Sequence, residues 1–130
     1  MDLQIGQQVF NKEIAGSSKE SIAMFSLATE DPNPIHVDKA FANKAGFPQV
    51  IQQGPMTTAF FASLLVQEFG INRLKVLDVS FTAPVFPGEA LTLTSEVIAI
   101  DDAVQLALSA RKADGTQTAK GLAIIAKREA

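Results

Sequence analysis

The sequence has no cysteine, no tryptophan, no tyrosine and a single histidine. Without cysteine the chain can form neither disulfide bonds nor thiolate metal sites, and one histidine excludes a histidine-rich metal site. No apolar run reaches the roughly 18 residues that indicate a membrane-spanning helix. The first residues also lack the basic and apolar regions of a signal peptide. We therefore expect a cytoplasmic enzyme or binding protein.

Basic residues are too few and too dispersed to indicate a nucleic-acid or membrane-surface binder. The chain has 11 Lys and Arg against 14 Asp and Glu, which gives a formal net charge of −3. Hydrophobic residues make up 47% of the sequence, which is enough to form a core. Because domains commonly run to roughly 100–200 residues, we expect residues 1–130 to form a single domain.

The only histidine, His36, closes the segment Asp31-Pro32-Asn33-Pro34-Ile35-His36. Each proline fixes its own φ and disfavours the α region for the residue before it, so this segment cannot be ordinary helix. Histidine exchanges protons near neutral pH, and the nearby carboxylate could complete an acid–base pair. The segment could also be a turn in which Asp31 and Asn33 bond to their own backbone and His36 packs beneath it. Spacing alone leaves both interpretations open.

Helices are predicted in the first half of the chain. Ser17 and Glu20 match a capping box, which places Ser17 at the N-cap of a helix, and Asp38 is typical of the N-cap of a second, short helix. A third helix over residues 56–69 follows Gly54-Pro55, and it should be buried because apolar residues cover most of its circumference. These helices are expected to end at about Thr29, Ala45 and Phe69.

The second half of the chain is typical of strands. Apolar and polar residues alternate most clearly from Val104 onward, and Asp114-Gly115 is a strong hairpin signal. Helices followed by an antiparallel sheet indicate an α+β domain, with the sheet wrapped round the buried helix. The open edges of such a sheet favour a homodimer. Strands are expected at residues 9–14, 74–85, 90–100, 104–112 and 118–127.

Two stretches resemble a known family. Residues 31–38, Asp-Pro-Asn-Pro-Ile-His-Val-Asp, resemble the D-x-N-P-[LI]-H-x-D signature of the MaoC-like, or (R)-specific, enoyl-CoA hydratases, and Ala40-Phe41-Ala42 and Gly46-Phe47 continue the match. Residues 80–89 resemble the later family stretch that ends in P-V-x-x-G-D or G-E. Two motifs in the correct order make this resemblance specific, and it covers most of the chain.

This resemblance implies a hot-dog fold, a homodimer, and reversible syn addition of water to a trans-2-enoyl thioester, which gives the (R)-3-hydroxyacyl thioester. It implies that Asp31 and His36 hold and activate water, and that the backbone N–H of Gly54 faces the thioester carbonyl. A donor at a helix N-terminus suits the negative charge that develops on that oxygen. No metal or redox cofactor is required, and coenzyme A or an acyl carrier is part of the substrate.

Asn33 and Gln53 are the further candidates for the substrate-binding site. Asn33 could contact the substrate, although fixing the loop is the better supported role. The segment Gln53-Gly54-Pro55 stands where the family usually has His-Gly-Met. If that histidine supports the loop, Gln53 can replace it; if it contacts the substrate, activity or specificity has changed. Glu30 and Ala62 also differ from the glycine and serine that many members carry.

Two other functions stay open. A hot-dog thioesterase hydrolyses its thioester with a carboxylate that often lies on the central helix, where this chain has only Glu68 near the far end. A non-catalytic acyl-thioester-binding protein, or the partner subunit of a heterodimeric dehydratase, would account for the changed Gln53-Gly54-Pro55 segment. Release of free thiol from a saturated acyl-CoA distinguishes the first alternative, and binding without turnover distinguishes the second.

Overall fold

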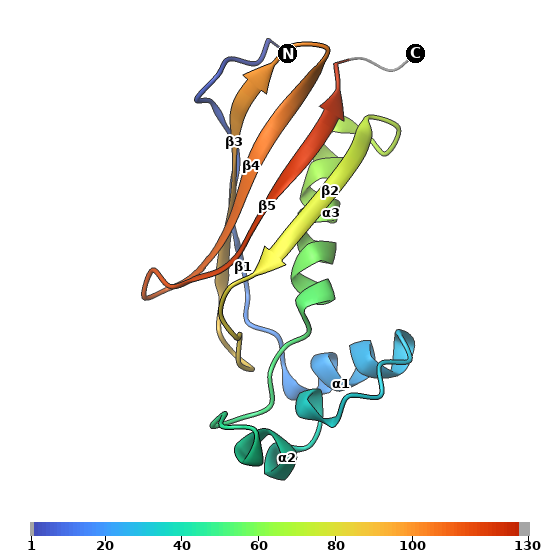
Figure 1. The fold of residues 1–130 in the computed structure, drawn as a ribbon, viewed down its shortest axis with the longest axis vertical. Helices are drawn as coiled ribbons and strands as arrows, with labels where there is room; N and C mark the ends of the chain where they lie inside the picture. The colour runs from blue at the N-terminus through green and yellow to red at the C-terminus, as the bar shows by residue number, and fades with distance from the viewer. Residues whose placement is uncertain (1, 128–130) are drawn as a thin grey trace.

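The computed structural model describes residues 2–127 as an antiparallel sheet packed on one long helix, with smaller helices at one end (Figure 1). This architecture confirms the predicted α+β class, whereas residues 1 and 128–130 of the expected domain lie outside the described part. The helices are α1 (Lys19–Ala28), α2 (Lys39–Lys44), α3 (Gly54–Phe69) and a 3₁₀ turn (Pro34–His36). The strands are β1 (Gln8–Ile14), β2 (Leu74–Phe81), β3 (Leu91–Ile100), β4 (Ala103–Lys112) and β5 (Gln117–Ala126).

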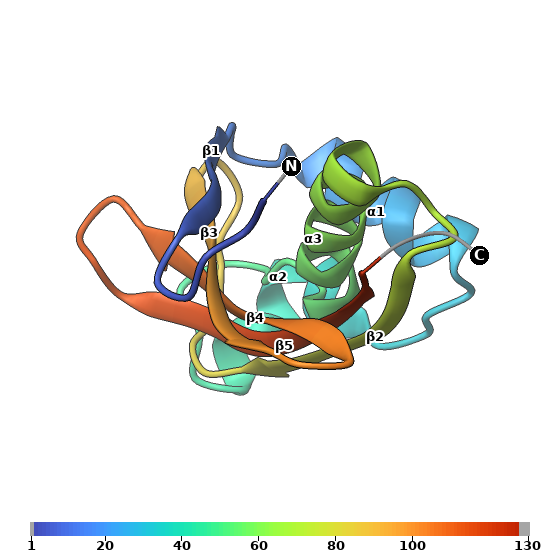
Figure 2. The same cartoon turned by 90° about the horizontal axis from the view of Figure 1, so that it is seen from above.

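All strand pairs are antiparallel, and the order across the sheet is β1-β3-β4-β5-β2. The first strand therefore pairs with the third, with Gln8 opposite Glu96, and β1 and β2 are the two edges. Seen from above, the sheet curves round α3 (Figure 2). This arrangement, a curved sheet holding one long helix, is the hot-dog fold that the sequence predicts.

One face of α3 forms the centre of the core. Phe61, Leu65 and Phe69 are buried and stand four residues apart, so they lie on one side of the helix. They pack against inward-facing residues of the sheet, among them Leu93, Val97, Leu106, Ala123 and Ile125. The opposite side, with Ala59 and Ser63, is exposed. The prediction of a buried helix therefore holds for one face only, because the sheet covers α3 from one side.

The start of α1 differs from the sequence prediction. The N-cap is Ser18, whose Oγ accepts a hydrogen bond from the Ser21 N–H at 3.0 Å, and not Ser17. Ser17 is engaged elsewhere, since its carbonyl accepts a hydrogen bond from the Gly88 N–H at 2.8 Å. A tertiary contact therefore moves the helix start by one residue. The predicted cap of α2 is confirmed, because Asp38 Oδ1 accepts the Phe41 N–H at 3.2 Å.

Several other element ends were predicted to within a few residues. Strand β2 ends at Phe81 and not at residue 85, because the N–H groups of Thr82 and Ala83 both turn to the Thr118 carbonyl. The hairpin between β4 and β5 is confirmed at Asp114-Gly115, where Gly115 has a φ of 90°. The Thr116 N–H donates to Asp114 Oδ1 at 2.8 Å, and this bond lowers the pKa of the Asp114 carboxyl.

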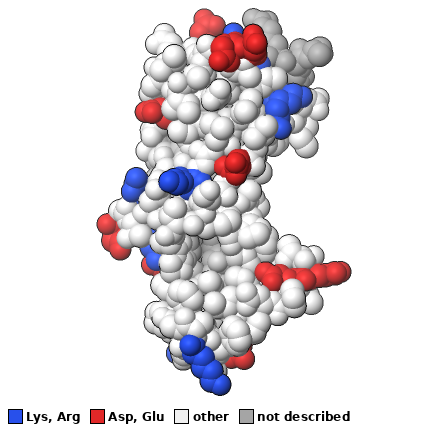
Figure 3. Space-filling view, viewed as in Figure 1, with Lys and Arg blue, Asp and Glu red and all other residues white. Residues whose placement is uncertain are grey.

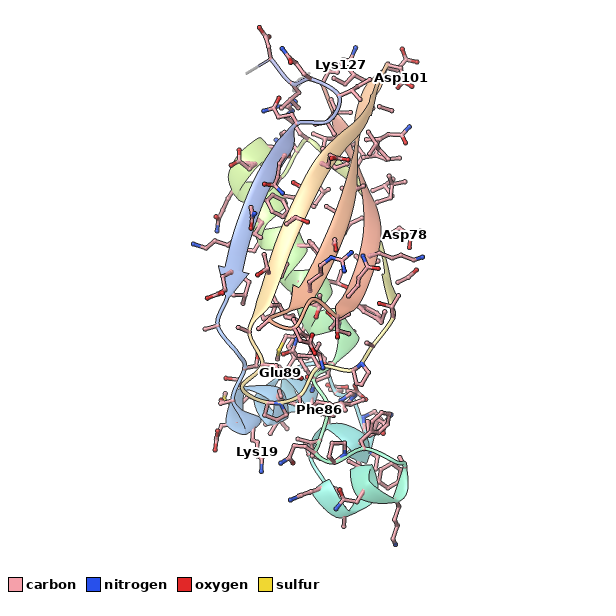
Figure 4. The ribbon with its side chains drawn as sticks, turned by 90° about the vertical axis from the view of Figure 1, so that its left-hand side faces the viewer. Lys19, Asp78, Phe86, Glu89, Asp101 and Lys127 are labelled. Atoms are coloured by element: carbon pink, nitrogen blue, oxygen red, sulfur yellow. The ribbon has the colours of Figure 1, made fainter. Side chains whose placement is uncertain are left out.

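The connection between β2 and β3 is anchored to the end of β4. Lys112 Nζ lies 2.9 Å from Glu89 Oε1 and 4.9 Å from the centroid of the Phe86 ring. The same Glu89 oxygen accepts the Phe86 N–H at 2.7 Å. Figure 4 shows Phe86 and Glu89 where the sheet meets the small helices. These contacts fix a loop whose Val85 carbonyl accepts the Gln52 N–H at 2.7 Å, directly before α3.

The face shown in Figure 3 has no concentration of charge of one sign. Lys and Arg side chains are scattered among Asp and Glu over the face shown in Figure 3, and neither sign forms a continuous stripe. Within residues 2–127, no helix is both long enough and apolar enough to cross a membrane.

Candidate active site

The segment 31–36 lies at the end of the molecule where α1 and α2 meet the N-terminus of α3 (Figure 1). Asp31 Oδ1 accepts the Asn33 N–H at 3.0 Å, and Asn33 Oδ1 accepts the Ile35 N–H at 3.1 Å. Pro34 occupies the first turn of the 3₁₀ helix, where a missing N–H costs nothing. The predicted turn is therefore present, and this turn holds both Asp31 and His36.

His36 is held on both sides of its ring. Its Nδ1 lies 2.7 Å from the Ile51 carbonyl oxygen, and its Nε2 lies 3.5 Å from Asp31 Oδ2. A carbonyl can only accept, so Nδ1 carries the proton, and the Nε2 of a neutral ring presents a lone pair. The His36 side chain is 11% exposed and that of Asp31 is 32% exposed. Two proton acceptors thus face each other at the surface, 3.5 Å apart.

Backbone bonds join this pair to the start of α3. The Ile51 N–H donates to the Ile35 carbonyl at 3.2 Å, while the Ile51 carbonyl holds the His36 ring. The next residue, Gln52, is bonded through its N–H to Val85, as described above. Residues 51 and 52 therefore fix the imidazole relative to Gly54, which begins α3 only two residues later.

Gly54 occupies the first position of a 16-residue helix, whose N-cap, Gln53, makes no capping bond with its side chain. An N–H group at this position has no partner inside the helix, and no acceptor for the Gly54 N–H occurs within residues 2–127. The next residue is Pro55, which has no N–H to compete with it. The positive end of the helix dipole adds to this donor.

A cavity of about 350 Å³ joins His36 and Gly54. Its remaining wall is mostly apolar, and is formed by Phe47, Ile51, Gln52, Gln53, Thr57, Phe81, Ala83, Pro84, Val85 and Thr118. Asp31 lies on a neighbouring hollow of about 450 Å³, together with Leu27 and Val37. Asp31 and His36 therefore lie between two hollows, with one residue lining each.

A model of the MaoC-like domain family matches residues 2–117 of the chain. The chain belongs to the MaoC-like family. It is 33% identical over 100 residues to the (R)-specific enoyl-CoA hydratase of Aeromonas caviae, an alignment that covers 75% of this chain and 73% of that one. The solved structure of an (R)-hydratase from A. caviae matches with a TM-score of 0.85 and 27% identity, over 95% of this chain and 96% of the other.

A second relative is much longer. The mouse peroxisomal multifunctional enzyme type 2 is 37% identical over 78 residues, which is 58% of this chain but only 10% of that enzyme. This MaoC-like chain therefore corresponds to a small part of a multifunctional protein as well as to most of a bacterial one.

Of the two predicted substrate-binding residues, only Gln53 lines the cavity. Asn33 is exposed, its side chain caps the 3₁₀ turn, and it does not line the cavity. Gln53 lines the cavity but is 1% exposed, and its Nε2 donates to the Ile22 carbonyl at 2.8 Å and to Ser26 Oγ at 2.7 Å. Gln53 is thus bound to α1 in this MaoC-like chain.

Most of the cavity residues were not selected as site residues from the sequence, among them Thr57, Phe81 and Thr118. Thr57 accepts a hydrogen bond from Gln52 Nε2 at 3.3 Å, and Thr118 comes from β5. Phe81 belongs to the second family motif, yet its aromatic ring gives no signal that distinguishes a cavity wall from a core residue. Thr118 carries no local signal at all, because only the sheet order brings β5 beside β2. Within the described part of the chain, no group of three His, Asp or Glu side chains could hold a metal ion.

Proposed function

We propose that this protein catalyses the reversible hydration of a trans-2-enoyl thioester to the (R)-3-hydroxyacyl thioester. The observation that carries the proposal is the His36 ring, which is bonded to Ile51 on one side and faces Asp31 on the other, beside a cavity that ends at Gly54. The name of the A. caviae relative, an (R)-specific enoyl-CoA hydratase, supports the same reaction and the same stereochemistry.

A water molecule can bridge the two side chains from beside the pair, because their acceptor atoms lie only 3.5 Å apart. His36 Nε2 and Asp31 Oδ2 both accept hydrogen bonds, and a water molecule supplies one O–H to each. In this position the water oxygen directs a lone pair away from both acceptors and toward the cavity. Holding a reactant in this way removes much of the entropic cost of bringing it to the reacting carbon.

The proton transfers follow from this arrangement. As the water oxygen bonds to C3 of the enoyl group, His36 Nε2 takes the proton of the water and the C2–C3 π electrons move to the thioester oxygen. The resulting enolate then takes a proton at C2 from the same acid–base pair, so that atoms and charge balance. Because one pair serves both carbons, oxygen and proton are added to the same face of the substrate.

Gly54 supplies the electrostatic part of the reaction. Its free N–H at the start of α3 donates to the thioester oxygen, where negative charge develops before C2 is protonated. The mostly apolar cavity wall strengthens this interaction because it keeps bulk water away. In the reverse direction the same groups expel water from the (R)-3-hydroxyacyl thioester.

The substrate includes the group that carries its acyl chain. Coenzyme A or an acyl carrier is proposed as the part of the thioester that lies outside the cavity, and the reaction itself needs no metal or redox cofactor.

We also propose a homodimer, which is supported by the open edge of β2, where Val76 and Phe81 are 41% and 51% exposed. The location in the cytoplasm stays a prediction from the sequence.

Thioester hydrolysis is the less favoured function. The carboxylate available on α3, Glu68, is exposed and lies 14 residues after Gly54. At a rise of about 1.5 Å per residue this distance is roughly 21 Å along the helix. Glu68 therefore cannot act on a thioester held at the cavity.

Loss of enoyl absorbance with crotonyl-CoA tests the proposal, with His36→Ala as the control. Turnover by the wild type that His36→Ala lacks would support the reaction and the role of His36. Turnover that survives in His36→Ala would contradict that role. Binding of crotonyl-CoA and of longer or carrier-bound enoyl thioesters without turnover of any of them would favour the non-catalytic alternative.

A further inference from the structure

Gln53 connects two parts of the candidate site that are far apart in the sequence. Both N–H groups of its side-chain amide are directed at α1, one to the Ile22 carbonyl and the other to Ser26 Oγ. Its own backbone leads directly into Gly54, the first residue of α3. One side chain thus joins the helix before Asp31 to the helix that begins with Gly54.

The partners of Gln53 determine which way its amide points. The Ile22 carbonyl can only accept, so the atom beside it must be the NH₂ group and not the oxygen. The amide oxygen Oε1 is then buried without a hydrogen-bond partner among residues 2–127. Burying an acceptor without a partner costs free energy. The side chain therefore forms its hydrogen bonds through the NH₂ group and leaves its oxygen without a partner.

Ser26 carries this connection on to the catalytic acid. While its Oγ accepts from Gln53, its backbone carbonyl accepts the Asp31 N–H at 2.9 Å. Ser26 is buried, as is Gln53, so neither contact is exchanged with solvent. Two hydrogen bonds, joined through Ser26, therefore connect Asp31 to Gln53, the residue that precedes Gly54.

We propose that Gln53 is a positioning residue that sets the spacing between the Asp31–His36 pair and the Gly54 N–H, and that it does not bind the substrate. This inference rests on the proposed hydration, because that reaction requires water at C3 and a donor at the thioester oxygen at the same time. Errors of about 1 Å in such spacing can cost roughly 10²-fold in rate. Gln53 would thus keep the two groups at the correct spacing through its bonds to α1, without contacting the substrate.

The test compares two glutamines whose side chains each donate to a serine hydroxyl. Gln53→Met keeps the length of the side chain but has no N–H, so it removes both bonds to α1. Gln117→Met is the matched control, because Gln117 Nε2 donates to Ser109 Oγ at 3.0 Å and Gln117 does not line the cavity of His36 and Gly54. With crotonyl-CoA we expect Gln53→Met to lower kcat by about tenfold or more with KM changed less than about threefold. Gln117→Met should leave kcat within about threefold of the wild type.

A second measurement does not depend on activity. Because His36 is the only histidine, its ring nitrogens can be assigned without ambiguity by ¹⁵N NMR. Gln53→Met should shift the His36 ring and Asp31 amide resonances, which belong to residues 17 and 22 positions away, whereas Gln117→Met should leave them in place. Gln53→His, which retains an N–H donor but adds a second histidine, should leave the Asp31 amide resonance in place. If Gln53→Met does not fold, Ser26→Ala removes one of the two bonds and should produce the same shifts at smaller amplitude.

Several outcomes would overturn the inference. A raised KM with unchanged kcat in Gln53→Met would make Gln53 a substrate contact. Equal losses of kcat in Gln117→Met and Gln53→Met would show that any lost glutamine–serine bond lowers activity, and that Gln53 has no special positioning role. Unchanged Asp31 and His36 resonances in Gln53→Met would show that Gln53 does not position these two residues. If the wild type shows no hydration while the resonances shift as expected, the proposed function fails and the positioning of Asp31 by Gln53 stands.

Discussion

Gly54 lies directly against the ring of Phe81, because a Cβ atom built on Gly54 would come within 2.6 Å of the ring carbon Cε2. The ring comes from the edge strand β2 and is 51% exposed. Phe81 also lines the same cavity as Gly54. The absence of a side chain at position 54 therefore allows the ring to close over the start of α3.

Gly54→Ala should displace this ring and slow the reaction. Because Phe81 is half exposed, its ring can swing outward, so we expect little loss of thermal stability. The altered cavity should nevertheless lower kcat/KM by about tenfold or more. The assay is crotonyl-CoA hydration by Gly54→Ala and by the double variant Gly54→Ala/Phe81→Ala. The double variant should regain activity, and one as slow as the single variant would show that crowding by the ring is not the cause.

Loss of either member of the acid–base pair should abolish most activity without unfolding the protein. Asp31→Asn retains the oxygen that accepts the Asn33 N–H, so it removes the charge and keeps the turn. We expect Asp31→Asn and His36→Ala each to lower kcat by about 10²–10⁴-fold, the usual range for general acid–base catalysis. Circular dichroism and thermal melts measure folding beside the kinetics.

Asp38 provides the matched control for Asp31. It belongs to the same motif, but its carboxylate caps α2 and does not line the cavity. Asp38→Asn keeps an acceptor at the N-cap, so activity should stay within about threefold of the wild type. A loss as large as that of Asp31→Asn would place a second catalytic acid at position 38.

Glu30 should be replaceable by glycine with a gain in stability. It has a φ of 54°, the one positive φ of a residue other than glycine among residues 2–127, and it directly precedes Asp31. An L-residue in this region is strained, so Glu30→Gly should stabilise the fold by about 1 kcal/mol in urea unfolding. Glu30→Ala keeps the Cβ and should give no gain. Equal gains in both variants would instead attribute the effect to the lost charge.

Gly16 should tolerate no side chain, although it is exposed. A Cβ there would lie 2.2 Å from the backbone carbonyl carbon of Gly88, and a backbone cannot move aside as a side chain can. Gly16→Ala should therefore destabilise the protein by about 2 kcal/mol or more. Ala15→Ser, at the neighbouring exposed position, should change stability by less than about 0.5 kcal/mol. Denaturant unfolding of the two variants checks this difference, and similar stability of both would contradict a steric clash between position 16 and Gly88.

The sequence was sufficient for the fold and for the local structure of the site. Alternation and a hairpin signal predicted the sheet, and two prolines predicted a rigid turn at residues 31–36. Those features depend on neighbours in the chain, so they can be read without knowing the fold. The catalytic assignments of Asp31, His36 and Gly54 stay predictions that the variants above test.

The features that could not be predicted are all long-range. Ser17 and Ser18 are chemically identical, and only the contact of the Ser17 carbonyl with Gly88 decides which one caps α1. Likewise, nothing in the residues near His36 indicates that the Ile51 carbonyl will fix its ring. The contacts of Gln53 also lie 27 and 31 residues away in sequence, so they became visible only in three dimensions.

The pairing of β1 with β3 has a consequence for the order in which the chain folds. Gln8 pairs with Glu96, and a contact of such wide sequence separation is slow to form. During synthesis β1 has no partner until most of the chain has been made, whereas the β4–β5 hairpin can close locally. Since α1 follows β1 directly, the helix that precedes Asp31 would be anchored late. The proposed acid–base pair would then be assembled only after the sheet is complete.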